Sequence, residues 1–427
     1  MLDIRLLRDQ PDLVKERLAG RDPVWAASID EVLACDMERR RLETETQRLQ
    51  AERKSTSKEI GVRKKQGEDT SEVEATVRGI GDQINELGRQ ATEAEEKQRQ
   101  LLLGIPNLPH PDCPVGQDEN ANPEIKQWGE KPSFDFEPVD HVELAHRLGL
   151  IDFERGAKVA GSGFLVLTGP GARLQRAALN FMLNLQSDEH GYTEINPPYL
   201  IRRECMTGTG QLPKFEDDMY GLEENQMFLA PTAEVPVTNL RREELLAHTE
   251  LPVAYAAYSP CFRREAGSAG KVSRGMIRVH QFDKVEMVRI TRAEDSYQQL
   301  EQMLTHAETV LQRLGLHYRV IELCTGDLGF GAAKTYDIEV WAPGHGGYLE
   351  VSSVSNFEDY QARRMQLRYK DAEGKNRMCH TLNGSGLAMP RLFVALIESG
   401  QQPDGSVRLP EPLHAAMGCE CLTPVQG

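Results

Sequence analysis

The chain has 427 residues and a formal net charge of −16, with 39% hydrophobic and 27% charged residues. This length exceeds a single ordinary core, which predicts two domains, and the acidic balance argues against indiscriminate nucleic-acid binding. No apolar run approaches the roughly 20 residues of a membrane span, and the N-terminal residues lack the apolar core of a secretory signal. We therefore expect a cytoplasmic protein that has no membrane contact.

The eight cysteines are scattered, without paired CxxC or Cys/His metal spacing. Cys419 and Cys421 form only a CxC, which is a weak signal for zinc. We expect reduced thiols and no zinc site.

A long helical segment opens the chain, because no proline occurs between Val24 and Pro106. Two heptad seams of the kind found in coiled coils run along it. The first is thin (Leu42, Thr46, Leu49, Arg53, Thr56 and Ile60), and the second is apolar (Val73, Val77, Ile80, Ile84, Leu87, Ala91 and Ala94). Between them "KKQGEDT", Lys64 to Thr70, supplies a glycine and an acidic helix-start signal. We expect two helices folded back as an antiparallel α-helical coiled-coil arm over about residues 30–103, within an N-terminal domain of residues 1–103.

The first helix of this arm is basic. Ten Lys/Arg stand against five Asp/Glu from Glu38 to Lys65, whereas four stand against seven from Ser71 to Gln100. Two readings are open: a solvated coiled coil whose opposite charges pair, or a basic surface for a nucleic-acid backbone. Helices of roughly 35 residues extend about 50 Å, whereas a body of about 320 residues has a radius of gyration near 20 Å. An arm of that length buries little against a core, which favours contact with a large partner.

Residues 104–138 are rich in Pro, Asn and Gly and predict a linker laid over a surface. From residue 139 to 427, helical patterns alternate with period-two strand patterns, and neither GxGxxG nor GxxxxGK[ST] occurs. Strands joined mostly by hairpins, with helices alongside, predict an antiparallel sheet in an α+β domain.

Arginines gather in one loop of this region, in "FRREAGSAGKVSRGMIRVHQF", Phe262 to Phe282, between two strand patterns. The loop of roughly ten residues, Glu265 to Arg274, exceeds the about two to five of an ordinary hairpin, which favours a functional role over a solvated charged turn. Guanidinium groups bind phosphate oxygens bidentately, and Phe282 on the returning strand is a candidate to stack on a base.

Two further stretches offer carboxylates. "FLAPTAEVPVTNL" places Thr232 and Glu234 on one face of an extended segment, where a buried carboxylate needs a cation such as a ligand ammonium. The alternative is a helix N-cap. "GGYLEVSSVSNFEDYQARR" places Glu350, Ser352 and Ser353 in a strand, where carboxylate and hydroxyl oxygens suit Mg²⁺. The alternative is an edge strand with a polar face.

A fourth stretch, "HTLNGSGLAMPRLFVALIE", reads as a small-residue turn, Asn383 to Gly386, that runs into an amphipathic helix. The small residues allow a backbone or a ligand to approach closely. Arg391 lies in the first turns of the helix, where an anion would be stabilised. The alternative is an ordinary strand–turn–helix.

Together these stretches resemble the motifs of class II aminoacyl-tRNA synthetases, and most closely those of bacterial seryl-tRNA synthetases. "GYTEINPPYLI" resembles motif 1, "FRREAGSAGKVSRGMIRVHQF" motif 2 and "GSGLAMPRLFVALIE" motif 3, while "TAEVP", "GDLGFGAAKTYDIEVW" and "EVSSVSNFEDYQARR" mark the serine member. The resemblance covers nearly the whole chain. It implies a class II antiparallel sheet of six or seven strands flanked by helices in residues 139–427, and a homodimer with motif 1 at its interface. It also implies that the arm grips tRNA(Ser).

The activity implied is ATP-dependent formation of seryl-adenylate from L-serine, with release of pyrophosphate. The seryl group is then transferred to the 3′ end of tRNA(Ser), and also of tRNA(Sec). By resemblance the ATP site comprises Arg263, Arg264, Glu265, Arg274, Phe282, Glu350, Val351, Ser352, Ser353 and Arg391. The serine site comprises Thr232, Ala233, Glu234, Glu286, Asn383 and Ser385.

The resemblance also implies roles. The catalytic residues would be Arg263 on the α-phosphate, Glu265 on the adenine amino group and Arg391 on the terminal phosphates, with Phe282 stacked on adenine and Arg274 assisting. Glu350 and Ser353 match the ligands of a Mg²⁺ ion bound with ATP, and no zinc is expected.

Two residues depart from the family pattern. Pro390 stands where a glycine is expected before Arg391, and a proline there removes an amide donor and can displace the arginine, although the first helical turn tolerates it. Arg264 stands where a serine is common, which we read as a neutral change.

Three related readings are open. An amino acid:carrier-protein ligase would share the catalytic domain but lack the long arm, which is complete here. A paralogue without catalysis would be a binding module, and the intact phosphate arginines and Glu350 speak against it. A second synthetase copy that serves an antibiotic pathway or resistance would have the same activity.

Overall fold

The computed structural model describes residues 1–266 and 274–425, and its contacts divide the chain into two units. One unit comprises Leu2–Pro106, and the other comprises Met1 with Asn107–Gly427. Residues 267–273, which belong to the predicted loop between Glu265 and Arg274, lie outside the described residues. None of the helices in the described ranges is both long and apolar enough to cross a membrane.

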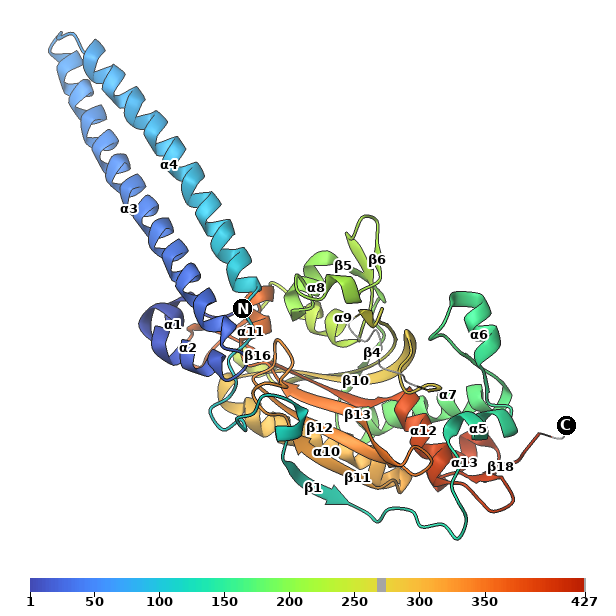
Figure 1. Cartoon of the computed structure of the whole chain (residues 1–427). Helices are drawn as coiled ribbons and strands as arrows, with labels where there is room; N and C mark the ends of the chain where they lie inside the picture. The colour runs from blue at the N-terminus through green and yellow to red at the C-terminus, as the bar shows by residue number, and fades with distance from the viewer. Residues whose placement is uncertain (267–273, 426–427) are drawn as a thin grey trace. The chain divides into compact units, whose positions relative to one another are not determined.

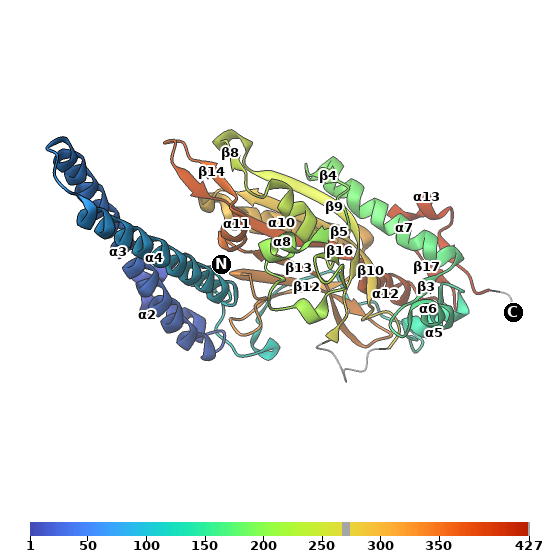
Figure 2. The same ribbon diagram turned by 90° about the horizontal axis from the view of Figure 1, so that it is seen from above.

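The smaller unit is all helical, and its two long helices lie side by side along their length (Figures 1 and 2). Its helices are α1 (Ile4–Asp9), α2 (Pro11–Ala19), α3 (Val24–Lys65) and α4 (Ser71–Leu103). The chain reverses between Lys65 and Ser71, where Gly67 adopts a φ of +77° that favours glycine. Asp69, one residue before the N-cap residue Thr70, accepts a hydrogen bond from the backbone N–H of Ser71 at 2.9 Å and so satisfies one N–H group at the start of α4. The predicted antiparallel hairpin is confirmed.

The predicted seams form the contact between the two helices. Leu42, Leu49 and Ile80 are buried, and the other apolar seam positions are half-buried on otherwise exposed helices. Arg53 is the charged residue of the first seam, and its guanidinium lies beside Gly81, which has no side chain to block it.

Charges on the arm pair mostly along each helix rather than between helices. Arg48 pairs with Glu45 and Glu52 on α3, and Arg89 pairs with Glu86 and Glu93 on α4. The ion pair of Lys64 with Glu74 at 2.7 Å does cross between them. Such exposed pairs contribute little to stability. The basic excess of α3 is therefore not cancelled by α4, and Arg40, Lys54, Lys58 and Lys65 are exposed on it.

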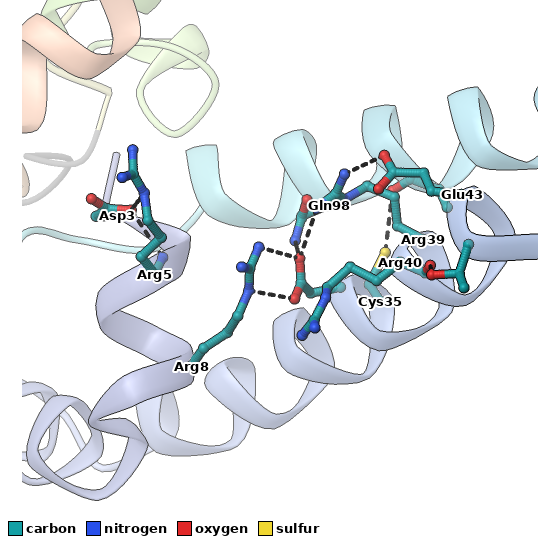
Figure 3. A network of polar contacts seen from close by, with 11 residues as sticks. Asp3, Arg5, Arg8, Cys35, Arg39, Arg40, Glu43 and Gln98 are labelled. Atoms are coloured by element: carbon teal, nitrogen blue, oxygen red, sulfur yellow. Dashed lines mark hydrogen bonds and ion pairs between the residues drawn. The ribbon is translucent and has the colours of Figure 1, made fainter. Parts of the chain in front are cut away.

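A buried carboxylate joins three helices at the base of the arm (Figure 3). Asp36 of α3 is 1% exposed and accepts from Arg8 of α1 (2.7 and 3.0 Å), Gln98 of α4 (2.8 Å) and Arg39 (3.2 Å). Burial acts to raise the pKa of Asp36, but the hydrogen bonds from these partners lower it overall. Nearby, the Cys35 thiol donates to the Ala94 carbonyl at 3.3 Å. These contacts fix the register of α3 against α4.

The larger unit is built on a sheet with eight strands in the described residues, in the order β1-β11-β12-β13-β16-β10-β9-β4. The strands are β1 (Glu124–Trp128), β4 (Thr193–Ile195), β9 (Val253–Phe262), β10 (Gln281–Thr291), β11 (Tyr318–Glu322), β12 (Lys334–Ala342), β13 (Gly347–Asn356) and β16 (His380–Ala388). Neighbours are antiparallel except β4 and β9, which are parallel. The antiparallel sheet flanked by helices is confirmed. The expected six or seven strands become eight when both short edge strands are included.

Helices pack against both faces of the sheet. They are α5 (His141–Arg147), α6 (Phe153–Ala160), α7 (Gly169–Asn184), α8 (Arg203–Thr209), α9 (Glu234–Thr238), α10 (Ser296–Leu314), α11 (Tyr360–Met365), α12 (Met389–Ser399) and α13 (Glu411–Met417). The main core lies between one sheet face and α7, α10 and α12 (Figure 1), where Met287 of β10 packs. The next residue, Val288, faces the opposite side, where it packs with Ala233 and Val237 near α9. The central strand β10 is therefore buried on both faces.

Short strands complete the unit in small sheets. They are β5 (Leu200–Arg202), β6 (Gly221–Leu222) and β7 (Met227–Leu229); β8 (Leu245–Leu246), β14 (Arg368–Lys370) and β15 (Asn376–Met378); β2 (Ile151–Asp152) and β3 (Val166–Leu167); and β17 (Val407–Arg408) and β18 (Cys421–Leu422).

The segment predicted as a linker, residues 104–138, has structure of its own. The Asn107 side chain donates to the carbonyls of Gly331 (3.0 Å) and Phe357 (2.9 Å), and β1 pairs with the edge strand β11. From Asn107 on, this proline-rich segment is thus part of the larger unit, held by side-chain hydrogen bonds and strand pairing that its composition does not reveal.

Candidate active site

A cavity of about 430 Å³ opens on the sheet face that carries α9. Its walls come from the segment before α9, the facing ends of β9 and β10, strands β13 and β16, and the start of α12. The predicted site residues that line it are Thr232, Glu234, Arg263, Glu265, Phe282, Glu286, Glu350, Val351, Ser353, Asn383, Ser385 and Arg391. Four stretches separated by up to about 160 residues in the sequence therefore meet at one site.

Four predicted site residues do not line the cavity in the part of the chain that the structure describes. Ala233 packs in the core beside Val288, and the Ser352 hydroxyl donates to the Ser385 carbonyl at 2.7 Å. The backbone N–H of Arg264 donates to the Asp218 carbonyl, and the Arg274 guanidinium pairs with Asp140 at 2.8 Å. Successive residues of a strand point to opposite sides, which separates Ser352 from its cavity-lining neighbour Ser353, whereas Ala233 has helical dihedrals at the start of α9.

The cavity also has lining residues outside the predicted ATP and serine sites: Ile277, Arg278, Val279, Lys284, Ser355, Phe357, Ala388 and Pro390. Of these, Arg278 belongs to the arginines of the loop stretch from which we expected phosphate binding. Lys284 matters most, since its ammonium forms a buried ion pair with Glu286. The signal was available in the sequence, because Phe282, Lys284 and Glu286 alternate along β10 and must share one face.

Guanidinium groups gather in one part of the cavity. Arg263 donates to the Pro231 carbonyl at 3.3 Å, and its Cζ lies 5.2 Å from the centre of the Phe282 ring. Arg391 donates to the Glu350 carbonyl at 2.8 Å, and the same nitrogen lies 3.3 Å from the Glu350 carboxylate. Arg278 donates to Glu265 at 2.7 Å. Cations fixed beside an aromatic ring suit a nucleotide that carries several phosphate charges.

Pro390 leaves Arg391 in the cavity. It occupies the second position of α12, where the missing N–H would have had no partner within the helix. The preceding residues Asn383 to Gly386 lie within strand β16, so the predicted small-residue turn is wrong. The glycines instead allow close packing between strands, since a Cβ on Gly384 would lie 3.1 Å from the Val354 side chain.

Two buried carboxylates form the acidic part of the cavity. Glu286 accepts from the Thr232 hydroxyl at 3.2 Å and pairs with Lys284. Glu234 accepts from Gln361 at 2.7 Å, and burial, followed by the charge of Glu286, raises the pKa of Glu234 to about 7. The Thr232 hydroxyl also accepts from the backbone N–H of Glu234 at 3.2 Å, at the start of α9. The stretch therefore starts a helix rather than forming the extended segment that we expected, although the N-cap residue is Ala233 and not Thr232. The binding of a ligand ammonium by Glu234 stays a prediction.

A β-bulge brings Glu350 and Ser353 together. Strand β12 pairs Glu339 with Glu350 and Ile338 with Ser352, so Val351 is the extra residue. A bulge shifts the alternation by one, which places Glu350 and Ser353 on the same face, where both line the cavity. Because β13 lies between β12 and β16, the edge-strand reading is wrong.

These two oxygen ligands fit a Mg²⁺ ion whose shell is completed by substrate phosphates. Asp337 lies opposite Ser353 on β12, and burial, followed by the charge of Glu350, raises the pKa of Asp337 well above its ordinary value. The charge of Glu350 thus opposes ionisation of Asp337, and a cation at this position would relieve that repulsion. In the described ranges, no group of three or more His, Cys, Asp or Glu side chains is arranged to hold a metal. The eight cysteines are all free.

Known proteins share both units of this chain. A family model for the seryl-tRNA synthetase N-terminal domain matches residues 1–109, and one for the tRNA synthetase class II core domain (G, H, P, S and T) matches residues 214–400. The serine–tRNA ligase of Akkermansia muciniphila is 64% identical over 426 residues and covers 100% of both chains. The chain belongs to the seryl-tRNA synthetase family.

Other seryl-tRNA synthetases support this assignment over the full length. The serine–tRNA ligase of Geobacillus kaustophilus is 54% identical over 419 residues, covering 98% of this chain and 99% of that protein. The crystal structure of seryl-tRNA synthetase from Pyrococcus horikoshii complexed with ATP has a TM-score of 0.95 at 40% identity, covering 100% of both chains. The resemblance drawn from the motifs is confirmed for the fold and the family.

Proposed function

We propose that the cavity carries out serine–tRNA ligation: formation of seryl-adenylate from L-serine and ATP, followed by transfer of the seryl group to tRNA. In the first step a serine carboxylate oxygen attacks the α-phosphorus of ATP and pyrophosphate leaves. In the second step a ribose hydroxyl at the 3′ end of tRNA attacks the seryl carbonyl and AMP leaves. The observation that carries the proposal is that one cavity combines fixed arginines with a buried carboxylate pair.

The guanidinium groups stabilise charge on ATP. Arg263 binds the α-phosphate and Arg391 binds the terminal phosphates, while Phe282 stacks on adenine and Glu265 accepts from its amino group. ATP brings about four negative charges into an acidic protein, so local cations have to overcome repulsion. Little acid–base chemistry is needed, because positioning and charge stabilisation lower the barrier.

The acidic part of the cavity binds serine. Glu234 and Glu286 hold the ammonium group, Thr232 orients Glu286, and Asn383 and Ser385 line the side of the pocket that takes the hydroxyl. Lys284 neutralises Glu286 until serine binds. A site built to hydrogen-bond a hydroxyl rejects alanine, which lacks it, by roughly 10⁴-fold. Threonine carries an extra methyl group and is excluded by shape.

Glu350 and Ser353 hold Mg²⁺ together with ATP. The ion would neutralise phosphate charge and orient the leaving pyrophosphate. Burial and the charge of Glu350 push Asp337, opposite Ser353, toward its protonated form, and a divalent ion at this position would favour its ionised form.

The arm binds tRNA(Ser), and also tRNA(Sec), through the exposed basic residues of α3. The protein acts in the cytoplasm as a homodimer, with motif 1 at the interface. Support comes from β4, which lies in motif 1 at one end of the sheet, where its outer side has no partner strand among the described residues. A carrier-protein ligase is less well supported, because the N-terminal domain matches that of the synthetases.

Serine-dependent exchange of labelled pyrophosphate into ATP tests the first step. We expect exchange with L-serine and Mg²⁺, and background rates with L-alanine and L-threonine. Equal exchange with alanine would show that the carboxylate pocket does not read the serine hydroxyl, and no exchange with any amino acid would refute the proposal.

A further inference from the structure

A buried polar link outside the cavity connects α12 to the returning end of the motif 2 loop. Glu398, in the last turn of α12, is fully buried. One of its carboxylate oxygens accepts from the backbone N–H (2.8 Å) and Nδ1 (3.1 Å) of His141. The other accepts from the backbone N–H groups of Gly344 and His345, both at 2.9 Å. The carboxylate is therefore fully satisfied and fixed in place.

The carboxylate of Glu398 determines the tautomer of His141. Because Glu398 accepts from Nδ1, the proton resides on Nδ1, and Nε2 has a lone pair free to accept. The backbone N–H of Met276 donates to this Nε2 at 3.3 Å. His141 is 2% exposed and Met276 is 1% exposed, so the contact is shielded from water.

The loop backbone lies directly against the His141 ring. Gly275 has a φ of +72°, and a Cβ built on it would lie 2.1 Å from Nε2 of His141. Only glycine permits this approach. Beside it, the Arg274 guanidinium pairs at 2.8 Å with Asp140, the N-cap residue of α5. The returning segment is thus attached at three consecutive residues, 274 to 276.

The attachment continues into the cavity. The carbonyl of Ile277 accepts from Nε of Arg391 at 3.4 Å, and Ile277, Arg278 and Val279 line the cavity. Arg391 and Glu398 are seven residues apart, or two turns, on one face of α12. One rigid helix therefore holds the returning segment twice, directly through Arg391 and indirectly through Glu398 and His141.

We propose that His141 and Glu398 are positioning residues for ATP binding. They hold the backbone of residues 274–278 so that Arg278 and its partner Glu265 stand at the adenine end of the cavity while Arg391 faces the phosphates. Neither residue lines the cavity in the described ranges, so both act through the loop. This inference rests on the proposed function, which assigns this part of the cavity to ATP.

Two substitutions at position 141 separate the two hydrogen bonds of the imidazole. In His141→Asn the side-chain amide replaces Nδ1, which keeps the donor to Glu398 and removes the acceptor for Met276. In His141→Gln the longer side chain reaches the Nε2 position, where its carbonyl oxygen can accept from Met276. Both remove the ring, so they are matched in lost packing.

The assay is serine-dependent pyrophosphate exchange by the full-length protein, with KM for ATP and for serine measured separately. Misplaced positioning groups can cost up to about 100-fold, and we expect His141→Asn to raise the KM for ATP by about tenfold or more. The KM for serine should stay within about twofold, and His141→Gln should recover most of the ATP affinity. Hydrogen exchange at the Met276 amide should be faster in His141→Asn than in His141→Gln.

Three results would overturn the inference. The first is equal loss of activity and of melting temperature in both variants, which indicates a packing role. The second is faster exchange at Met276 with an unchanged KM for ATP. The third is a serine KM that rises as much as the ATP KM.

A variant on the loop side and a site control complete the design. If His141→Asn does not fold, Gly275→Ala forces the loop from the ring while leaving His141 and Glu398 intact, and an unchanged KM for ATP in it would overturn the inference. Arg263→Ala in the same assay keeps failures apart. Normal pyrophosphate exchange by Arg263→Ala refutes the proposed ATP site itself. Loss of exchange in Arg263→Ala, together with an unchanged KM for ATP in His141→Asn, refutes only the positioning role.

Discussion

The buried charge of Glu234 should lower the free energy of unfolding, and replacement of Glu234 by glutamine should remove this destabilisation. The side chain is 7% exposed, and burial and the charge of Glu286 raise the pKa of Glu234 from its ordinary value of 4.5 to about 7. A carboxyl group that binds its proton more tightly in the folded state destabilises the fold once the pH exceeds its unfolded pKa. Each pKa unit corresponds to about 1.4 kcal/mol, so the full penalty above pH 7 is about 3 kcal/mol.

Glu234→Gln keeps the shape and the oxygen that accepts from Gln361, but carries no charge at any pH. The stability of the natural protein should fall as the pH rises from about 4.5 to about 7, and that of the variant should lack this fall. The charge of Glu234 lowers the free energy of unfolding by about 2 kcal/mol at pH 6 and by about 3 kcal/mol at pH 8.5. The free energy of unfolding of the variant, relative to that of the natural protein, should therefore rise by about 1 kcal/mol between these pH values.

Urea unfolding of both proteins at pH 6 and pH 8.5 measures this difference. The same variant should lose about tenfold to 100-fold in serine-dependent exchange, because a hydrogen bond to the charged ammonium is removed. A stability difference that does not change with pH would refute the reasoning, since Glu234 would then have an ordinary pKa. Full retention of serine affinity would show that the buried charge does not serve the amino acid.

Two further predictions concern the other parts of the chain. Arg263→Ala should lower the rate of serine-dependent pyrophosphate exchange by about 100-fold or more, since it removes a fixed cation from the phosphate site. Arg377→Ala, on the exposed strand β15, is the control and should leave the rate unchanged. Equal rates for the two variants would contradict the assignment of Arg263 to the phosphate site. Replacing residues 45–87 by a short Gly/Ser loop should preserve pyrophosphate exchange but abolish tRNA charging, because the contacts of Cys35 with Ala94 and of Asp36 with Gln98 remain. Normal charging by this shortened arm would refute its role.

Local patterns in the sequence were sufficient for the arm and for the two strands of motif 2. The heptad positions from Val73 to Ala94 are half-buried or buried in α4, whereas most residues between them are exposed. A repeat of 3.5 residues places them on one side of the helix, where they pack against α3. The alternation before Phe262 and after Gln281 places them in paired strands, β9 and β10. In each case the information lies within a few residues of the element that it specifies.

Features that depend on pairing between distant strands could not be predicted. The side-chain alternation of "LEVSS" alone puts Glu350 and Ser353 on opposite faces, and only the bulge at Val351, set by pairing with β12, puts them on one face. The contact of Gln361 with Glu234 joins residues 127 apart in the sequence, and that of Glu398 with His141 joins residues 257 apart. No local spacing contains such contacts, since they arise from the packing of helices that are distant in the sequence.

Of the site residues taken from the motifs, those whose side chains face the cavity line it, and those that the backbone turns away do not. Arg263 and Glu265 line the cavity, but Arg264 between them does not, and Arg274 pairs with Asp140 instead. A motif names the residues in order, whereas the local backbone, which follows β9 and has Glu265 at a φ of +52°, decides which of them face the cavity.

Transfer of labelled serine to purified total tRNA, with ATP and Mg²⁺ and with labelled threonine as the control, tests the proposed function most directly. We expect acid-precipitable serine and no precipitable threonine. Serine-dependent pyrophosphate exchange without any transfer to tRNA would contradict ligation to tRNA and favour a different acceptor for the seryl group. Equal labelling with threonine would contradict the assignment of the carboxylate pocket to serine.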